Sequence, residues 1–138
     1  MGDNPLLVAA GRFHGHIGPF LAIGLRMGLL ANERMGRAPM DMEAKVRVVP
    51  RPPRSCTLDG IQYASGCTLG KASIRVEPDP AEVTAEFKLG SRTLGIRLRP
   101  GFLECMEREL KGGPEKAIID YAFQIMDTPL DDLFEVAE

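Results

Sequence analysis

The chain has 138 residues, of which 44% are hydrophobic and 26% charged, and its formal net charge is −2. This length and this composition indicate one globular domain that can bury its own core, not a disordered chain. The lack of a basic excess argues against a nucleic-acid partner, and no apolar run approaches the ~18 residues of a membrane span, so we expect no membrane partner either.

Residues 1–16 hold a short apolar run and both histidines of the chain. The run, residues 6–10, is too short for a signal peptide, which predicts a cytoplasmic protein. The histidines lie two positions apart in FHGHIGPF, residues 13–20. Residues two apart in an extended loop point the same way, so His14 and His16 could face one metal ion.

The residues that follow predict a helix over 19–35. Pro19 suits the first helical position, and Gly36 suits the end of the helix. Its apolar residues lie almost all round, which is typical of a buried helix. Gly24 and Gly28, four apart, leave a bare stripe that another element can approach closely.

Four later segments alternate between apolar and polar residues, as strands do. The turn Gly90-Ser91 predicts a hairpin of type II′ between the last two. One apolar face and one polar face predict an antiparallel sheet that is covered on one side, with Ile74 and Val76 pointing inward. The four expected strands are 44–50, 72–78, 82–90 and 92–100.

A short helix is expected over 57–64, and two more over 101–111 and 114–126. The order of elements is helix, strand, helix, three strands, helices. This order predicts a single α+β domain over residues 1–138 with two layers. Its core would cover about residues 10–100, and the C-terminal helices about 101–138.

The second group of reactive side chains is CTLDGIQYASGCTLGK, residues 56–71. Cys56 and Cys67 lie at opposite ends of the expected short helix, which would be ~13 Å long. Both thiols therefore cannot bind one ion unless the chain doubles back or a second protomer intervenes. The number of cysteines, three, is odd and argues against a disulfide framework. Cys105 is expected on a buried face, with no part in chemistry.

These two stretches together resemble the core domain of the FmdE family, which is named after a component of formylmethanofuran dehydrogenase, over about residues 10–100. The family pattern His-Gly-His-x-Cys-Pro-Gly corresponds to residues 14–20. The pattern Cys-x-x-Asp-Ala-Ile-Gln, followed by Thr-Gly-Cys-Thr-x-Gly-Lys, corresponds to residues 56–62 and 65–71. The resemblance implies a helix-strand-helix-three-strand fold similar to the catalytic domain of glyceraldehyde-3-phosphate dehydrogenase.

The chain departs from the family pattern at four positions: Gly18 replaces Cys, Phe20 replaces Gly, Gly60 replaces Ala and Ser65 replaces Thr. The change at position 18 removes a thiolate ligand. Only Cys105 follows the core, so the C-terminal zinc finger of many relatives is not expected.

The resemblance implies a metal-binding protein, accessory or stand-alone, linked to molybdenum or tungsten enzymes of one-carbon (formylmethanofuran) metabolism. The expected cofactor is a divalent metal, zinc, and a molybdenum or tungsten enzyme is an expected partner. The expected ligands are His14 and His16, completed by Cys56 or Cys67.

Three further residues are expected around that site. Asp59 or Gln62 would accept the second ring proton of a metal-bound imidazole, and Lys71 would hold an anionic ligand. We also expect a homodimer, because the helix 19–35 needs cover on every side and because the resemblance implies intertwined pairs.

Two other functions remain open at this point. A zinc ion with an open fourth position could activate water, or a Cys67 thiolate could act as a nucleophile, which would make the protein an enzyme of unknown substrate. The histidines and cysteines could instead line the pocket of a metal-free module that binds a small ligand.

Overall fold

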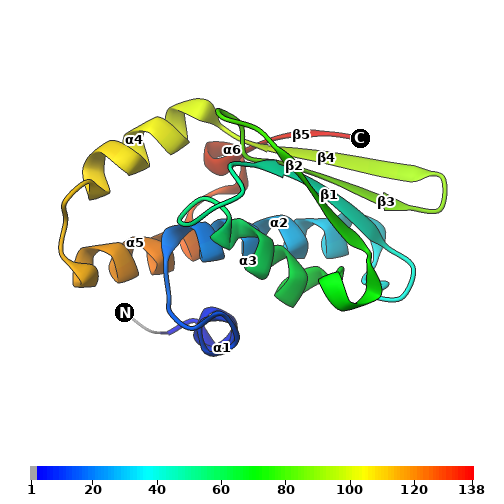
Figure 1. Cartoon of the computed structure of the whole chain (residues 1–138), viewed down its shortest axis with the longest axis horizontal. Coiled ribbons are helices and arrows are strands. Elements are labelled where there is room, and N and C mark those ends of the chain that lie inside the picture. The colour runs from blue at the N-terminus through cyan, green and yellow to red at the C-terminus, as the bar shows by residue number, and fades with distance from the viewer. Residues whose placement is uncertain (1–2) are drawn as a thin grey trace.

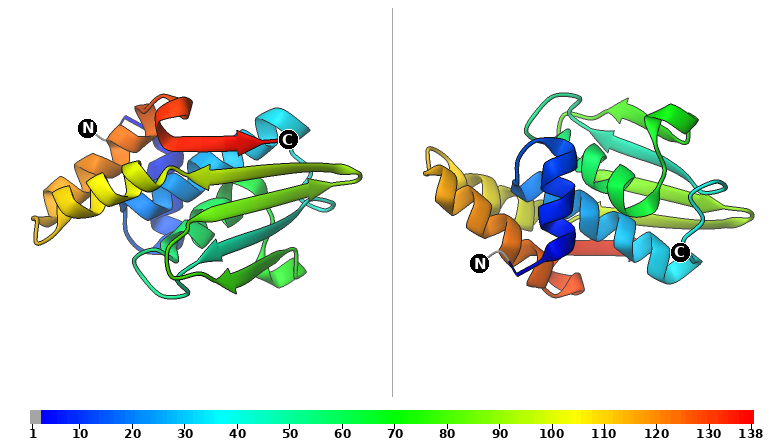
Figure 2. Two further views of the ribbon diagram at one scale, coloured as in Figure 1. Left: turned by 90° about the horizontal axis from the view of Figure 1, so that it is seen from above. Right: turned by 90° about the horizontal axis from the view of Figure 1, so that it is seen from below.

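The computed structural model describes residues 3–138. A five-stranded sheet covers one side of the long helix α2, the helices α3 and α5 lie beside α2, and α1 lies across its far side (Figures 1 and 2). The helices are α1 (Pro5–His14), α2 (Pro19–Met35), α3 (Cys56–Ser65), the single 3-10 turn η1 (Leu69–Lys71), α4 (Pro100–Leu110), α5 (Glu115–Asp127) and α6 (Leu130–Leu133). The strands are β1 (Glu43–Val48), β2 (Ile74–Pro78), β3 (Thr84–Leu89), β4 (Arg92–Leu98) and β5 (Phe134–Ala137).

The helix α2 is the centre of the fold. It begins at Pro19 and ends before Gly36, as its sequence predicts, and its apolar residues are buried on every side. The cover comes from elements of the same chain, namely the sheet, α1, α3 and α5 (Figure 2). The apolar surface of α2 therefore no longer argues for a second protomer.

The two helices α2 and α3 cross at very short distance. A Cβ atom at Gly24 would overlap the carbonyl oxygen of Thr57, and one at Gly60 would overlap that of Leu21. A Cβ atom at Gly28 would lie 2.7 Å from that of Ala64. The prediction of a bare stripe on α2 is thus confirmed, and α3 contributes a matching glycine of its own.

The sheet has the strand order β2-β1-β3-β4-β5. The expected hairpin is confirmed, since β3 and β4 pair with Leu89 opposite Arg92, and Gly90 has the positive φ (62°) that the first position of a type II′ turn requires. The expectation of an antiparallel sheet is wrong for one pair. The strands β1 and β2 run parallel, joined by a crossover through α3.

Three further expectations need correction. Val76 is 41% exposed, because β2 is an edge strand of the sheet. The residues after α5 are not all helical, since β5 pairs antiparallel with β4. The expected order of elements began with the helix 19–35, but residues 5–14 already form a helix, α1. Asn4 caps it by accepting a hydrogen bond from the Leu7 amide at 3.0 Å.

The end of α5 is fixed to α2 by one partly buried cation. Nη1 of Arg26 donates hydrogen bonds to the carbonyl oxygens of Ile125 at 2.6 Å, Met126 at 3.2 Å and Thr128 at 2.7 Å. A cation is favourable at this position because helix carbonyl oxygens at a C-terminus lack partners. The contact holds α5 against the domain, although Gly112 and Gly113 separate it from α4.

No single helix within residues 3–138 is long and apolar enough to cross a bilayer. The helices α1 and α2 meet the length and hydropathy criteria only as a pair, and that pair is bent by 117°.

We expect Gly24→Ala to lower the free energy of unfolding by about 3 kcal/mol, since the added methyl group meets backbone atoms that can yield only if the helices separate. Chemical denaturation followed by circular dichroism measures the change. Gly101→Ala in α4 is the matched control, because a Cβ atom there meets nothing within 4 Å, and it should be neutral or slightly stabilising. A Gly24→Ala protein as stable as the wild type would contradict the close crossing.

Candidate metal centre

The two histidines lie at the sharp bend between α1 and α2. His14 is the last residue of α1, and Gly15 reverses the chain in the left-handed region at a φ of 112°. The segment up to Pro19 then leads into α2. The histidines therefore belong to a helix end and a turn, not to the extended loop that their spacing indicated, yet their ring centroids lie only 4.6 Å apart.

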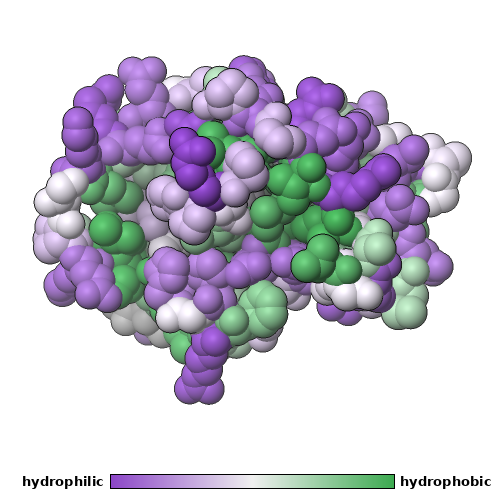
Figure 3. Space-filling model, in the orientation of Figure 1, coloured by the Kyte–Doolittle hydropathy of each residue, from purple (hydrophilic) through white to green (hydrophobic). Residues whose placement is uncertain are grey.

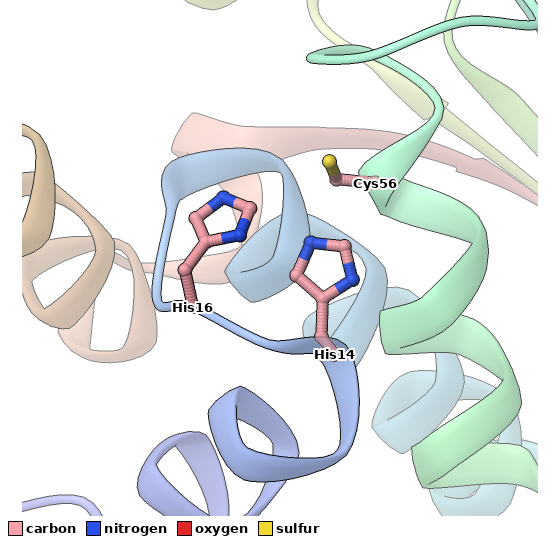
Figure 4. Close-up of side chains that lie close together, drawn as sticks. All are labelled: His14, His16 and Cys56. Carbon is pink, nitrogen blue, oxygen red and sulfur yellow. The ribbon is translucent and has the colours of Figure 1, made fainter.

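Cys56 faces both imidazoles from the first residue of α3. One nitrogen of His14, one of His16 and the Cys56 sulfur all lie within 4.8 Å of one another. Figure 4 shows both rings on the same side of the turn as the sulfur. Tetrahedral zinc holds such ligand atoms about 3.5 Å apart, so small side-chain rotations would bring the three atoms to bonding distance.

A carboxylate holds the His14 ring from behind. Nδ1 of His14 lies 2.6 Å from Oδ2 of Asp59, and Oδ1 of Asp59 accepts a hydrogen bond from Nε2 of Gln62 at 3.1 Å. Gln62 in turn accepts a hydrogen bond from the Leu69 amide at 2.9 Å. A second partner of this kind is typical of histidines that bind metals, because it fixes the tautomer and the orientation of the ring.

The other nitrogen of His14 is what makes a metal fit. Nε2 is buried and has no hydrogen-bond partner among the described residues, and the side chain is only 10% exposed. A buried nitrogen without a partner costs free energy that a ligand would recover. With Nδ1 donating to Asp59, the lone pair of Nε2 is directed away from that carboxylate and is free to bind a cation.

The thiol of Cys56 is in an environment that keeps it protonated when no cation is present. The residue is 9% exposed, and burial raises the pKa of its thiol, with a further increase from the charge of Asp59. A divalent ion at the site would oppose both effects, since metal coordination deprotonates a thiol. A metal bound here would therefore release a proton.

The other expected site residues lie elsewhere. Cys67 lies beyond the opposite end of α3, is fully buried, and donates a hydrogen bond to the Met42 carbonyl oxygen, and burial raises the pKa of its thiol. Lys71 is exposed and donates to the hydroxyl of Thr68 at 3.0 Å. Cys105 was expected to take no part in the site and to lie on a buried face; the second expectation is wrong, since Cys105 is only partly buried on α4 and donates to Glu109 at 3.1 Å. The structure thus brings Cys56 to the histidines and does not bring these three residues there.

Gly18 borders the same space. A Cβ atom on Gly18 would lie 3.4 Å from Nε2 of His16, in ordinary van der Waals contact. The position where the family pattern carries a cysteine therefore points at the His16 ring. With glycine there, this position supplies no side chain to the candidate centre.

Two cavities meet at Cys56. One, of about 460 Å³, lies between α3 and β2 and includes His14 and Asp59 in its lining. The other, of about 540 Å³, lies towards α5 and includes His16, Gly18 and Glu115. A ligand could therefore reach the three converging atoms from either side.

Comparison with known proteins identifies a family and a curated relative. Residues 13–135 match the family described as "FmdE, Molybdenum formylmethanofuran dehydrogenase operon". A protein of Archaeoglobus fulgidus described as "Probable S-adenosyl-L-methionine-binding protein" is 43% identical over 73 residues. That match covers 50% of this chain and 19% of the relative, so the chain spans far less than the relative's full length.

We expect neutral His14 to carry its proton on Nδ1, because a carboxylate can only accept the hydrogen bond at 2.6 Å. Proton–nitrogen correlation spectra of nitrogen-15-labelled, metal-free protein distinguish the two tautomers. The His16 ring is the internal control, since it has no carboxylate partner within residues 3–138. In Asp59→Asn, His14 should become a mixture of tautomers. A wild-type His14 protonated on Nε2 would contradict the assignment.

Proposed function

The chain belongs to the FmdE family, and from that premise we propose that it is a metal-binding protein that works alongside a molybdenum or tungsten formylmethanofuran dehydrogenase. The observation that carries the proposal is the convergence of His14, His16 and Cys56 around a buried imidazole nitrogen with no partner in the described chain. The link to the dehydrogenase rests on the family, whose description names that enzyme's operon.

The donor set favours zinc. Two imidazoles and one thiolate are borderline-soft ligands, which suit zinc better than magnesium or calcium. Three protein ligands and one open position are typical of catalytic zinc, whereas structural zinc has four. Zinc held by His14, His16 and Cys56 would supply Lewis acidity.

The residues of the chain have separate tasks in this proposal. Asp59 holds the His14 ring and keeps its Nε2 unprotonated, while Gln62 holds Asp59. Cys56 supplies the one negative ligand, and its proton leaves when the metal arrives. Cys67 and Cys105 take no part, because each has a hydrogen-bond partner far from the histidines.

The open position also supports an enzymatic function, with a substrate bound where the family pattern carries a thiolate. A metal-free binding module is the weaker alternative, because it would leave Nε2 of His14 buried without a partner among residues 3–138. A homodimer and a cytoplasmic location remain part of the proposal. Neither is needed to complete the site, since all three ligands come from one chain.

The curated relative suggests a second candidate, binding of S-adenosyl-L-methionine. The cavity of about 460 Å³ is in the size range of small-molecule sites. However, the acidic residue in its lining, Asp59, is already paired with His14 and Gln62. No lysine or arginine of the described chain lines the cavity to receive the carboxylate of that molecule. We therefore place this candidate second, and titration calorimetry with S-adenosyl-L-methionine decides it.

The metal proposal is tested on protein purified without a histidine tag. We expect about one zinc per chain by elemental analysis, and a cobalt-substituted form with a sulfur-to-cobalt charge-transfer band. His14→Ala and Cys56→Ala should each lose most of the metal, because each removes one of three ligands. Cys67→Ala and Cys105→Ala are matched controls that should retain it. Equal metal content in all four variants would refute the site.

We further expect Gly18→Cys to bind zinc at least about tenfold more tightly, because the added thiolate would occupy the open position. The backbone at Gly18 is extended, with a φ of −150°, so a side chain is tolerated. A second sulfur ligand should also intensify the charge-transfer band of the cobalt form. An unchanged spectrum would show that position 18 does not face the metal.

A further inference from the structure

The cavity between α3 and β2 has an apolar wall that lies open to solvent. On the face seen in Figure 3, hydrophobic side chains gather between these two elements. The apolar lining residues are Pro50, Pro52, Leu58, Leu69, Ile74 and Val76. At its inner end the cavity reaches His14 and Cys56, so it leads directly to the candidate metal centre.

We propose that this cavity binds a small uncharged organic molecule, with its apolar body against the wall and a hydroxyl or thiol head at His14 and Cys56. The inference names the ligand class of the site described above and rests on the proposed function in that respect. The apolar cavity itself does not require the metal.

The size of the cavity sets the first limit. Its volume of about 460 Å³ lies near the lower end of the range for ligand pockets, about 300–1,000 Å³. It therefore suits a molecule smaller than a dinucleotide. The apolar lining suits a hydrocarbon body, whose burial contributes about 25 cal/mol per Å².

The charges of the lining set the second limit. Within residues 3–138, no lysine or arginine lines the cavity, and Asp59 is the acidic residue in its lining. A phosphate or carboxylate on the ligand would find no cation and would be repelled by Asp59. Asp59 is also engaged by His14 and Gln62, so it offers a cationic ligand only a carboxylate that is already paired.

Two exposed side chains supply independent support. Leu69 is 78% exposed and Val76 is 41% exposed, and both belong to the wall of the same cavity. Val76 also occupies a position whose alternation predicts burial. A hydrocarbon lying between α3 and β2 would cover part of both side chains, which no other element of the described chain does.

The test compares hexan-1-ol with hexanoate, which share one alkyl chain and differ in the charge of the head. Binding is followed by the methyl resonances of Ile74 and Val76 in metal-free protein. We expect hexan-1-ol to shift these resonances with a Kd of about 1 mM. Hexanoate should bind at least about tenfold more weakly to the metal-free protein.

A single charge in the wall should reverse this preference. In Val76→Lys, the ammonium group would pair with the carboxylate head and shorten the apolar wall, so hexanoate should bind more tightly than hexan-1-ol, as followed by the Ile74 methyl resonances. Met40→Lys is the matched control, since Met40 is also an exposed apolar residue but lies outside the cavity. It should leave the wild-type order unchanged.

The inference is overturned if hexanoate binds the metal-free wild type as tightly as hexan-1-ol, or if neither probe shifts the two methyl resonances. It is also overturned if Met40→Lys reverses the order as Val76→Lys does. These affinities are measured without metal, whereas the proposed function fails on zinc content alone. The two failures are therefore distinguishable.

Discussion

The close crossing of α2 and α3 is the constraint on which the site depends. Glycines on both helices let the backbones approach until Gly24 faces Thr57 and Gly60 faces Leu21. At this separation the first residue of α3, Cys56, reaches the turn that precedes α2. Larger side chains would move α3 outward, and the sulfur would leave the two imidazoles. The same contact therefore stabilises the core and positions the candidate ligands.

The spacing along α3 adds the supporting groups. Cys56, Asp59 and Gln62 are three residues apart, so they lie on one stripe of the helix. Cys56 faces the candidate metal position, and Asp59 holds the His14 ring. Gln62 donates a hydrogen bond to Asp59 and accepts one from the Leu69 amide. A pattern of Cys-x-x-Asp-x-x-Gln on a helix thus combines a candidate ligand with the residues that support it.

Local patterns predicted α2, α3, the hairpin and the glycine stripe because each depends on neighbouring residues. The strand β5 was missed because its partner β4 lies far back in the chain, and the exposure of Val76 depends on the edge position of β2. The sequence does contain signals for the helix α1: Asn4 suits the N-cap, Pro5 the first turn, and Gly15 the residue that ends the helix. At the site, the sequence left Cys56 and Cys67 as alternatives, because both belong to the motif and only the packing of α3 against α2 brings one of them to the histidines.

The distribution of charge explains why a metal suits this position. Two arginines of the sheet are paired with carboxylates: Arg47 binds Glu77 at 3.1 Å, and Arg97 binds Glu82 and Glu135 at 2.8 Å each. In the part of the chain described, neither cavity at Cys56 has a lysine or arginine in its lining, while Asp59 and Glu115 are present. Without an ion, the site combines an acidic surrounding with a protonated thiol. A divalent cation would balance the charges of one thiolate and of Asp59, and would thereby leave a nearly neutral centre at the end of an apolar cavity.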